Sequence, residues 1–388
     1  MNIQNLDKQY VANTYNRFPL TLVSGVGSRV VDSEGKEYID LGTGIAVNTF
    51  GINDEEWKEA VVSQLGKIQH TSNLFYSEPC ALLAEELCKR TGMKKVFFCN
   101  SGAEANETAV KAARKYASDK KGGEYNVIVT LHNSFHGRTI SMLSATGQDA
   151  FHRDFLPLTE GFVYADANDL DSVKKLVSEN KVAGIMVETI QGEGGVLPLS
   201  EEFVSGIADI CEREDILFIV DEVQTGNGRT GALYSYMNYG ITPDIVTTAK
   251  GLGGGLPLGA CMLGDKVENT FKFGDHGSTF GGNPVACAGA LSILKRLDEG
   301  LLREVREKSE YITSTLSENE GVISISGRGF MLGIECKRDA SEVLASARDG
   351  GVIAIKAKNK VRLLPPLNIS WDDLRLAVDV LSSALKGE

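Results

Sequence analysis

The stretch Leu217-Phe218-Ile219-Val220-Asp221 is an apolar run that ends in an acid. A second run reaches a lysine followed by glycines, Asp244-Ile245-Val246-Thr247-Thr248-Ala249-Lys250-Gly251-Leu252-Gly253-Gly254-Gly255. A short β-branched run closed by a polar residue is typical of a buried parallel strand. Open α/β sheets place their chemistry at the carboxyl ends of such strands. Asp221 and Lys250 are therefore predicted to face one crevice.

An acid and a lysine at one sheet edge are the pair that pyridoxal phosphate enzymes need, because the acid keeps the ring nitrogen protonated and the lysine attaches the cofactor covalently. Each residue alone has an ordinary explanation: a strand-end Asp often caps the next helix, and a loop Lys is usually solvated. Four glycines among the five positions after Lys250 favour the functional interpretation. They cost conformational entropy, but they let backbone approach a ligand closely.

Length and composition indicate a soluble globular enzyme with more than one domain. The chain has 388 residues, of which 42% are hydrophobic and 24% are charged. One ordinary core does not serve a chain of this length, so we expect a large and a smaller domain. The net charge of -12 argues against a nucleic-acid partner, since phosphate binding needs a basic face. No apolar stretch is long enough to cross a bilayer.

Cysteine usage favours a reducing compartment. The seven cysteines are scattered and contain no C-x-x-C pair, which is typical of small buried hydrophobes. The first residues, Met1 to Asp7, lack a basic-then-apolar signal. We therefore expect the cytoplasm.

The middle of the chain predicts an α/β fold. From about Ser77 to Gly264, amphipathic segments alternate with six short apolar runs, at 96–99, 127–129, 185–187, 217–220, 245–248 and 260–263. Strands that alternate with helices indicate a mostly parallel sheet covered on both faces.

Both ends of the chain have a different pattern. Residues 29–40 predict a hairpin that turns at Ser33 to Lys36. After Pro284, one long helical pattern runs through Leu291 to Leu302 and leads to apolar runs at 322–325 and 330–334, an α+β pattern. We predict an N-terminal segment (1–50) that packs with a small C-terminal domain (291–388), and a large cofactor-binding domain (51–290).

Two segments supply groups for an anionic, planar ligand. Ser101-Gly102-Ala103 follows the 96–99 run and opens a helix, so its backbone N–H groups form an anion site, although a plain Ser N-cap is an alternative. In Ser134-Phe135-His136-Gly137-Arg138-Thr139, Phe135 is suited to stack on a ring and Arg138 to grip a carboxylate. His132 and His136 have the helical metal spacing, but they flank a loop and lack a third ligand, so a metal site is not favoured.

Two further segments are predicted to wall the pocket. Glu188-Thr189-Ile190-Gln191-Gly192-Glu193-Gly194-Gly195 follows the 185–187 run, and it lacks the third glycine of a dinucleotide fingerprint. Arg362 stands among Val361, Leu363 and Leu364, and a buried guanidinium needs an anion from substrate or protein.

Together these motifs make the chain resemble the class III (ornithine-type) aminotransferases over about residues 14–370. The resemblance is carried by ordered segments at 44–48, 70–75, 101–106, 135–139, 191–195, 221–226, 249–255, 278–283 and 362–366. Two positions depart from the family pattern: Gly51-Ile52-Asn53-Asp54-Glu55 replaces a Gly-His-x-His-Pro run, and Thr189 replaces a proline.

The resemblance implies a fold type I pyridoxal 5'-phosphate enzyme, with a mostly parallel sheet in the large domain and a smaller α+β domain. It implies that Lys250 attaches the cofactor and carries the proton, that Asp221 pairs with the ring nitrogen, and that Gln224 approaches the ring hydroxyl. Phe135 would stack on the ring. The phosphate would lie against Ser101, Gly102 and Ala103 and would also meet Thr279 of a neighbouring subunit, so that a homodimer shares its active sites.

The resemblance also implies how the substrates are bound. Glu193 would pair with Arg362 while an ω-amine is bound and release it to grip the α-carboxylate of glutamate. Arg138 would hold the distal carboxylate, and Ser278 is expected beside the substrate.

The expected reaction moves the terminal amino group of N-acetylornithine to 2-oxoglutarate. Succinylornithine, ornithine and 4-aminobutyrate stay open as donors, because a few methylenes discriminate only about 10- to 200-fold. The alternative from another class is a non-catalytic binding protein on the same fold. Intact Asp221 and Lys250 argue against it.

Overall fold

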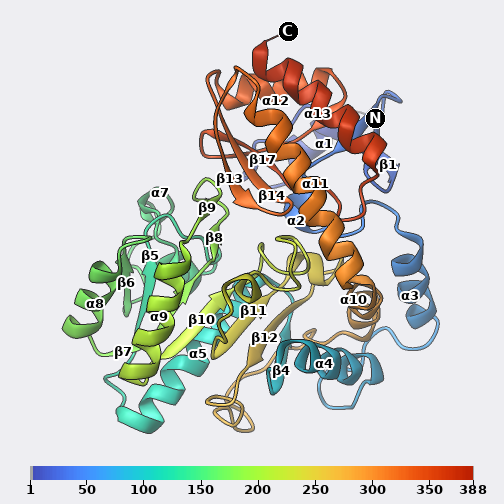
Figure 1. Cartoon of the computed structure of the whole chain (residues 1–388). Helices are drawn as coiled ribbons and strands as arrows, with labels where there is room; N and C mark the ends of the chain where they lie inside the picture. The colour runs from blue at the N-terminus through green and yellow to red at the C-terminus, as the bar shows by residue number, and fades with distance from the viewer. Residues whose placement is uncertain (1–2, 388) are drawn as a thin grey trace.

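A seven-stranded sheet forms the centre of the computed structural model, which describes residues 3–387 (Figure 1). The strand order is β4-β12-β11-β10-β7-β5-β6. Only β12 runs antiparallel to its neighbours, so the predicted α/β class with a mostly parallel sheet is confirmed. The strands are β4 Lys95–Cys99, β5 Val127–Leu131, β6 Phe162–Ala165, β7 Val182–Val187, β10 Leu217–Asp221, β11 Ile245–Thr248 and β12 Gly259–Leu263.

All six predicted apolar runs are strands of this sheet. The seventh strand, β6, was not predicted, although its residues Phe162 to Ala165 are all hydrophobic. β6 is an edge strand that pairs only with β5, and three of its four residues are only partly buried.

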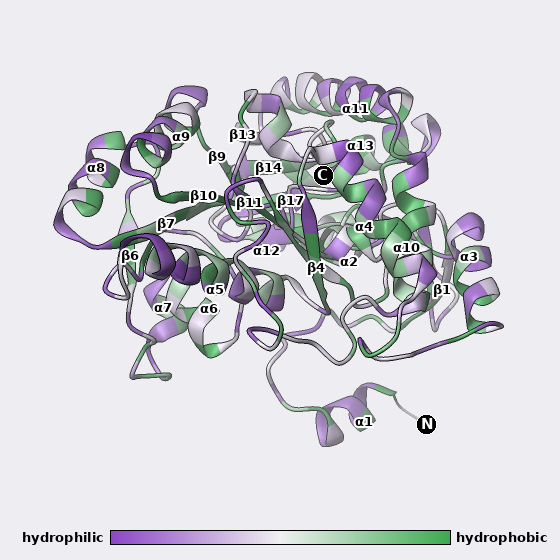
Figure 2. Ribbon diagram, turned by 90° about the horizontal axis from the view of Figure 1, so that it is seen from below, coloured by the Kyte–Doolittle hydropathy of each residue, from purple (hydrophilic) through white to green (hydrophobic). Residues whose placement is uncertain are grey.

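Helices cover both faces of the central sheet. Leu217 and Ile219 join an apolar cluster with α5 (Gly102–Lys121), whereas Phe218 and Val220 belong to the cluster that contains α9 (Glu201–Glu214). This alternation follows from the two-residue period of a strand. In Figure 2 the central strands β7 and β10 are green along their length, and the helices show one polar side. The remaining helices of this part are α4 Glu78–Thr91, α6 Ile140–Ala145, α7 Asp149–His152 and α8 Leu170–Glu179.

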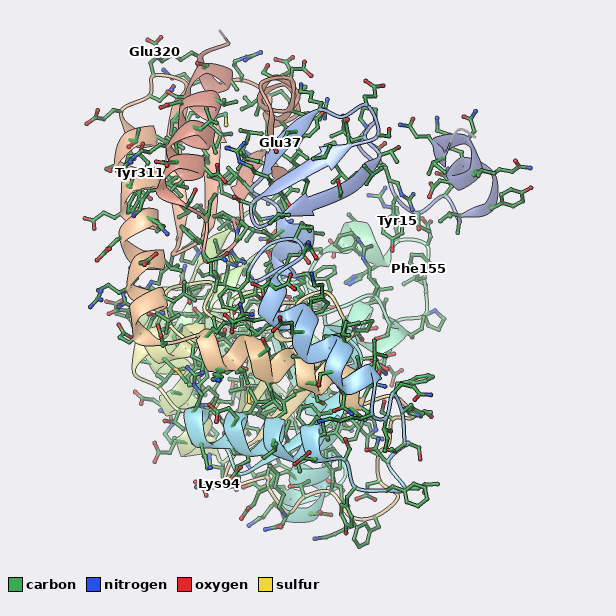
Figure 3. The ribbon with its side chains drawn as sticks, turned by 90° about the vertical axis from the view of Figure 1, so that its right-hand side faces the viewer. Tyr15, Glu37, Lys94, Phe155, Tyr311 and Glu320 are labelled. Atoms are coloured by element: carbon green, nitrogen blue, oxygen red, sulfur yellow. The ribbon has the colours of Figure 1, made fainter. Side chains whose placement is uncertain are left out.

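The N-terminal segment is joined to the C-terminal part by a shared sheet. The predicted hairpin is present as β2 (Arg29–Asp32) and β3 (Glu37–Asp40), with β1 (Leu22–Val26) beside β2. β15 (Val352–Ile353) pairs in parallel with β3. Figure 3 shows Glu37 on this sheet, apart from the central sheet.

The C-terminal part contains an antiparallel sheet of order β13-β14-β17-β16. The three helices that accompany it lie at one end of the molecule in Figure 1. The elements are β13 Val322–Arg328, β14 Met331–Cys336, β16 Ile355–Ala357, β17 Lys360–Leu363, α11 Glu299–Ser317, α12 Ala340–Asp349 and α13 Trp371–Lys386. The short elements elsewhere are α1 Ile3–Tyr10, α2 Thr43–Ala46, α3 Glu55–Leu65, β8 Ile190–Gln191 and β9 Leu197–Pro198.

The single long helix expected after Pro284 is wrong, because the pattern is divided into α10 (Pro284–Arg296) and α11. Leu297 leaves the helical region with φ -78 and ψ 67. The side chain of Asp298 then accepts a hydrogen bond from the backbone N–H of Leu301 and begins α11. An Asp N-cap starts a new helix without interrupting the leucine spacing, which concealed the break. The helix α10 packs on α3 and α4, and the predicted division of the chain at residue 290 falls inside it. That division stays a prediction.

The two departures from the family pattern each have a local structural use. Asp54 caps α3 by accepting from the backbone N–H of Trp57, and it pairs with both terminal nitrogens of Arg296 at 2.7 and 2.9 Å. The hydroxyl of Thr189 donates to Ser235 Oγ at 2.7 Å inside the protein. A proline would not supply that donor.

Candidate active site

A cavity of about 420 Å³ lies where the central strands end. Its walls come from the segments that follow β4, β5, β7, β10 and β11. Asp221 and Lys250 both line it. The other predicted site residues in its wall are Ser101, Gly102, Ala103, Phe135, Arg138 and Gln224.

The Asp221 carboxylate is held by three donors. Its Oδ2 atom accepts from Asn106 Nδ2 at 2.7 Å and lies 2.8 Å from Nδ1 of His136, and its Oδ1 accepts from the backbone N–H of Val223 at 3.0 Å. Thr247 Oγ1 donates to Asn106 Oδ1 at 2.6 Å and so fixes the amide. Because Asp221 is only 3% exposed, this network rather than water satisfies its charge.

Asn106 and His136 were not among the predicted site residues. Asn106 is 1% exposed within the alanine-rich buried face of α5. A buried amide on an otherwise apolar helix face needs a polar partner, and this signal is readable in the sequence. From the sequence, His136 is considered only with His132, as a metal pair that is not favoured. Its pKa is raised, because the hydrogen bond and charge of Asp221 outweigh burial, which by itself lowers it.

Glu188 is a second buried acid in the cavity wall. Burial is the main cause that raises its pKa to about 7, and the charge of His136 opposes the rise. Its oxygens accept from the backbone N–H groups of Phe135 at 2.8 Å and Gly192 at 3.2 Å. Glu188 therefore ties the loop after β5 to the loop after β7.

Lys250 lies two residues after the end of β11 at Thr248 and has a positive φ of 44°. A non-glycine residue seldom adopts this conformation, and such residues cluster at functional sites. Burial lowers the pKa of its amine, while the negative charge of Glu193 opposes that shift. The amine is therefore easier to deprotonate than an ordinary lysine.

Ser101 is the N-cap of α5, and its place in an anion site stays a prediction. Its hydroxyl accepts from the backbone N–H of Glu104 at 3.2 Å, and the Glu104 carboxylate reaches back to accept from the backbone N–H of Asn100, the residue before the cap, at 2.8 Å. Gly102 and Ala103 nevertheless present the first turn of the 20-residue helix α5 to the cavity. A Cβ at Gly102 would lie 2.6 Å from Val223 Cγ1, so the approach is close. The helix N-terminus is thus able to receive an anion.

Glu193 and Arg362 are paired beside this cavity. Arg362 Nη1 lies 2.6 Å from Glu193 Oε1, and it also donates to Gln224 Oε1 at 2.9 Å. The side chain of Arg362 is 3% exposed. Burial raises the pKa of Glu193, but the charge and hydrogen bond of Arg362 outweigh it and the pKa is lowered. The anion that a buried Arg362 requires is therefore present in the protein.

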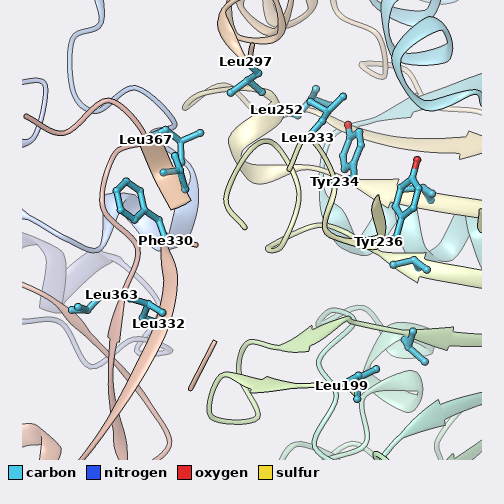
Figure 4. Close-up of a cluster of buried hydrophobic side chains, with 14 of the residues drawn as sticks. Leu199, Leu233, Tyr234, Tyr236, Leu252, Leu297, Phe330, Leu332, Leu363 and Leu367 are labelled. Atoms are coloured by element: carbon cyan, nitrogen blue, oxygen red, sulfur yellow. The ribbon is translucent and has the colours of Figure 1, made fainter. Parts of the chain in front are cut away.

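Arg229 secures the strand that carries Arg362. Its buried guanidinium donates to the carbonyl oxygens of Pro365 and Phe330. Burial lowers its pKa to about 9. Pro365 follows β17 and Phe330 precedes β14, so this contact joins the loop after β10 to the C-terminal sheet. Figure 4 shows Phe330, Leu363 and Leu367 on one side of this junction and Leu233 and Leu252 on the other.

Arg138 is exposed and lies over the ring of Phe151, with its guanidinium carbon 4.2 Å from the ring centroid. Within residues 3–387 no acid forms an ion pair with it, so its charge is available to a ligand.

Ser278 and Thr279 do not line the cavity. The hydroxyl of Ser278 accepts from Asn100 Nδ2 at 3.4 Å, and Asn100 lies in the cavity wall. Thr279 is exposed and borders a small recess that also contains His70 and Ser72. The structure therefore separates Thr279 from the cavity of its own chain.

Two negative observations concern the described residues as a whole. Across residues 3–387, His, Cys, Asp and Glu side chains nowhere gather as three or more in a way that could hold a metal ion. In the same range no helix combines the length and apolar character needed to span a membrane.

Comparisons with known proteins agree with this geometry. The family model described as aminotransferase class-III matches residues 10–385. A curated acetylornithine aminotransferase from Haemophilus ducreyi is 48% identical and covers 99% of this chain and 98% of that protein. The crystal structure of N-acetylornithine aminotransferase from Stenotrophomonas maltophilia is 36% identical, with a TM-score of 0.85, covering 99% of this chain and 98% of that one.

An ornithine aminotransferase from Toxoplasma gondii is also similar, with 30% identity and a TM-score of 0.95. The match covers 99% of this chain and 94% of that one. That protein has PLP at partial occupancy in its active site.

Proposed function

Because this chain belongs to the class III aminotransferases, we propose that it transfers the terminal amino group of N-acetylornithine to 2-oxoglutarate. The products are N-acetylglutamate semialdehyde and glutamate, and the reaction serves arginine biosynthesis. The observation that carries this proposal is the ion pair of the buried Arg362 with the partly buried Glu193. It provides a carboxylate receptor that is masked when the donor has no carboxylate beside its amine.

The cavity residues fit pyridoxal 5'-phosphate as the cofactor. The buried Asp221 carboxylate suits a protonated ring nitrogen, the start of α5 suits the phosphate, and Lys250 supplies the amine for covalent attachment. Phe135 provides an aromatic face in the same wall, and we assign Gln224 to the ring hydroxyl. When bound, the cofactor supplies a carbonyl that takes up the amino group and a ring that accepts electrons.

Lys250 is the residue that moves the proton. Its pKa is lowered chiefly by burial, so Nζ is able to accept the proton from the substrate carbon that bears the amine and to return it. Asn106, His136 and the Val223 N–H all contact the Asp221 carboxylate, so Asp221 would be held in position to pair with the ring nitrogen of the bound cofactor.

Two arginines divide the recognition of substrate. Arg138 holds the distal carboxylate in both half-reactions, with Ser278 near the same end. Arg362 binds the α-carboxylate of glutamate after leaving Glu193. With N-acetylornithine, Arg362 stays paired, which avoids the cost of about 1 to 3 kcal/mol for a buried donor left without a partner.

We further propose a homodimer in which Thr279 reaches the phosphate site of the partner. Its exposure and its distance from the cavity of its own chain support this arrangement. Large apolar side chains around the same segment are also exposed and suit an interface: Ile68, Leu74, Phe75, Tyr76 and Phe280.

Mixing two inactive variants tests the shared site. Lys250→Ala and Thr279→Val chains, dissociated and reassociated together, should regain activity, because a hybrid dimer contains one complete site. Absence of recovery, with hybrid dimers demonstrated by mass spectrometry, would place Thr279 outside the partner's site.

The free state of all seven described cysteines supports a cytoplasmic location for the enzyme.

The choice of donor is tested by kcat/KM with N-acetylornithine, succinylornithine, ornithine and 4-aminobutyrate, each with 2-oxoglutarate. We expect N-acetylornithine to lead. A clear preference for 4-aminobutyrate would overturn the proposed substrate while leaving the class of reaction intact.

A further inference from the structure

We infer that Gln224 is a third member of the gate formed by Glu193 and Arg362, and that Gly192 is a positioning residue that leaves room for the Gln224 amide. Gln224 holds Arg362 in its paired position and so sets the preference between an ω-amine donor and glutamate. The inference rests on the proposed function, because it concerns the same two donors.

The contacts of Gln224 join both members of the pair. Its Oε1 atom accepts from Arg362 Nη1 at 2.9 Å, and its Nε2 atom lies 3.4 Å from Glu193 Oε1. A guanidinium only donates and a carboxylate only accepts, so this orientation of the amide is the one that satisfies both neighbours. Gln224 therefore completes a triangle in which Arg362 is bonded to two side chains.

Gly192 determines whether the amide fits. A Cβ at this position would lie 2.8 Å from each of the three terminal atoms of Gln224, Cδ, Nε2 and Oε1. Real Cβ atoms do not approach so closely, and the amide would have to shift. The φ of Gly192 lies outside the left-handed region, so the backbone does not require glycine here. The space that the Gln224 side chain needs explains the glycine at position 192 instead.

Burial gives the triangle its effect. Gln224 is 7% exposed and Arg362 is 2% exposed, so little water is available to replace a lost bond. To receive an α-carboxylate, Arg362 must leave both Glu193 and Gln224. A donor without that carboxylate leaves both bonds in place. Each bond to Arg362 thus favours the ω-amine over glutamate.

Two substitutions at position 224 should act in opposite directions. Gln224→Met has similar size and no acceptor, so Arg362 is released more easily and the kcat/KM for glutamate relative to N-acetylornithine should rise about tenfold, the scale of one hydrogen bond to a charged group. Gln224→Glu adds a second carboxylate and should lower the same ratio by about as much. If both variants move the ratio in one direction, Gln224 acts only on the cofactor and the inference is wrong.

A binding measurement tests the effect of Gln224 on Arg362 without any catalytic step. Glutarate has two carboxylates and no amine, and its dissociation constant is measured by calorimetry on the PLP-loaded enzyme. Glutarate should bind more tightly to Gln224→Met and more weakly to Gln224→Glu than to the wild type. Unchanged affinities would overturn the inference.

Gly192→Ala tests the positioning role. It should resemble Gln224→Met in the donor ratio and in glutarate affinity, and it should add nothing further in the Gln224→Met background, because both act on one bond. Gly66→Ala is the matched control, since a Cβ there meets only ordinary contacts of 3.4 Å or more on an exposed helix end. Full additivity of Gly192→Ala and Gln224→Met would refute the role of Gly192.

Failure of the proposed function is a separate outcome. In that case the wild type does not use N-acetylornithine, whatever the variants do. The glutarate measurements still decide whether Gln224 restrains Arg362.

Discussion

Asp221 and His136 share a buried hydrogen bond of 2.8 Å between Oδ2 and Nδ1. The histidine side chain is fully buried and the carboxylate is 3% exposed. Burial by itself lowers the pKa of His136, but the hydrogen bond and charge of Asp221 outweigh it and the pKa is raised. Asn106, His136 and the Val223 N–H together hold the Asp221 carboxylate in the cavity wall, where it would pair with the ring nitrogen of the proposed cofactor.

Asp221→Asn should abolish most activity while preserving the fold. The amide has nearly the same shape but no charge, and charge complementarity in a buried site is worth at least about a hundredfold in rate. Single-turnover rates and circular dichroism measure the two effects. An active Asp221→Asn enzyme would contradict the assignment of Asp221 to the ring nitrogen.

Lys250→Ala should prevent covalent attachment of pyridoxal phosphate, because no other amine is assigned to the cofactor in the cavity. After borohydride treatment, mass spectrometry should find the reduced cofactor on Lys250 in the wild type and in the control variant Lys175→Ala, which changes an exposed lysine. The Lys250→Ala variant should carry no reduced cofactor. A covalent adduct retained by the variant would assign the attachment to another residue.

Glu193→Ala should free Arg362 from its ion pair. The affinity for glutamate should rise and the kcat/KM for N-acetylornithine should fall, each by about tenfold or more for the loss of a buried charged partner. Half-reaction rates with each donor measure these changes. The rates of Glu193→Gln should lie between those of Glu193→Ala and those of the wild type. Equal changes for both donors would mean that Glu193 does not act as a gate.

Glu222→Gln should flatten the pH dependence of stability. Burial raises the pKa of Glu222 from 4.5 to about 7, so the folded protein keeps a proton that the unfolded chain releases between these values. The stabilisation is fully present below the unfolded pKa and is lost as the pH rises through about 7. The difference has an upper limit of about 3 kcal/mol.

Urea unfolding at pH 5 and pH 8 measures this effect. The exposed Glu202→Gln serves as control. If Glu222→Gln and the wild type lose the same stability between the two pH values, Glu222 does not titrate as expected.

Asp54 stabilises the protein in two ways, as the N-cap of α3 and as the ion-pair partner of Arg296, and variants can measure the two contributions separately. Asp54→Ala removes both and should cost about 1 to 2 kcal/mol, whereas Asp54→Asn keeps an N-cap and should cost about half as much. Thermal unfolding of both variants, and of each in an Arg296→Met background, measures the two parts. Equal losses in Asp54→Ala and Asp54→Asn would show that the cap contributes little.

The central strands and most of the cavity wall were predictable from the sequence for one reason. Their side chains are buried on both faces, so each strand is a continuous apolar run, and a polar residue at its end marks the sheet edge. Asp221, Lys250 and the start of α5 follow directly from that rule. The break at Leu297 was not predictable from the same pattern, because the leucine spacing continues across Asp298.

The central sheet and the edge where its functional groups gather follow from the sequence alone, and the class of reaction follows from resemblance. The contacts between side chains at that edge arise only in the folded molecule: Asn106 and His136 bond to Asp221, and Gln224 bonds to Arg362. These residues lie 115, 85 and 138 positions from their partners. Local periodicity describes which face a residue occupies, whereas a hydrogen bond depends on a distance of about 3 Å that exists only after the segments have packed.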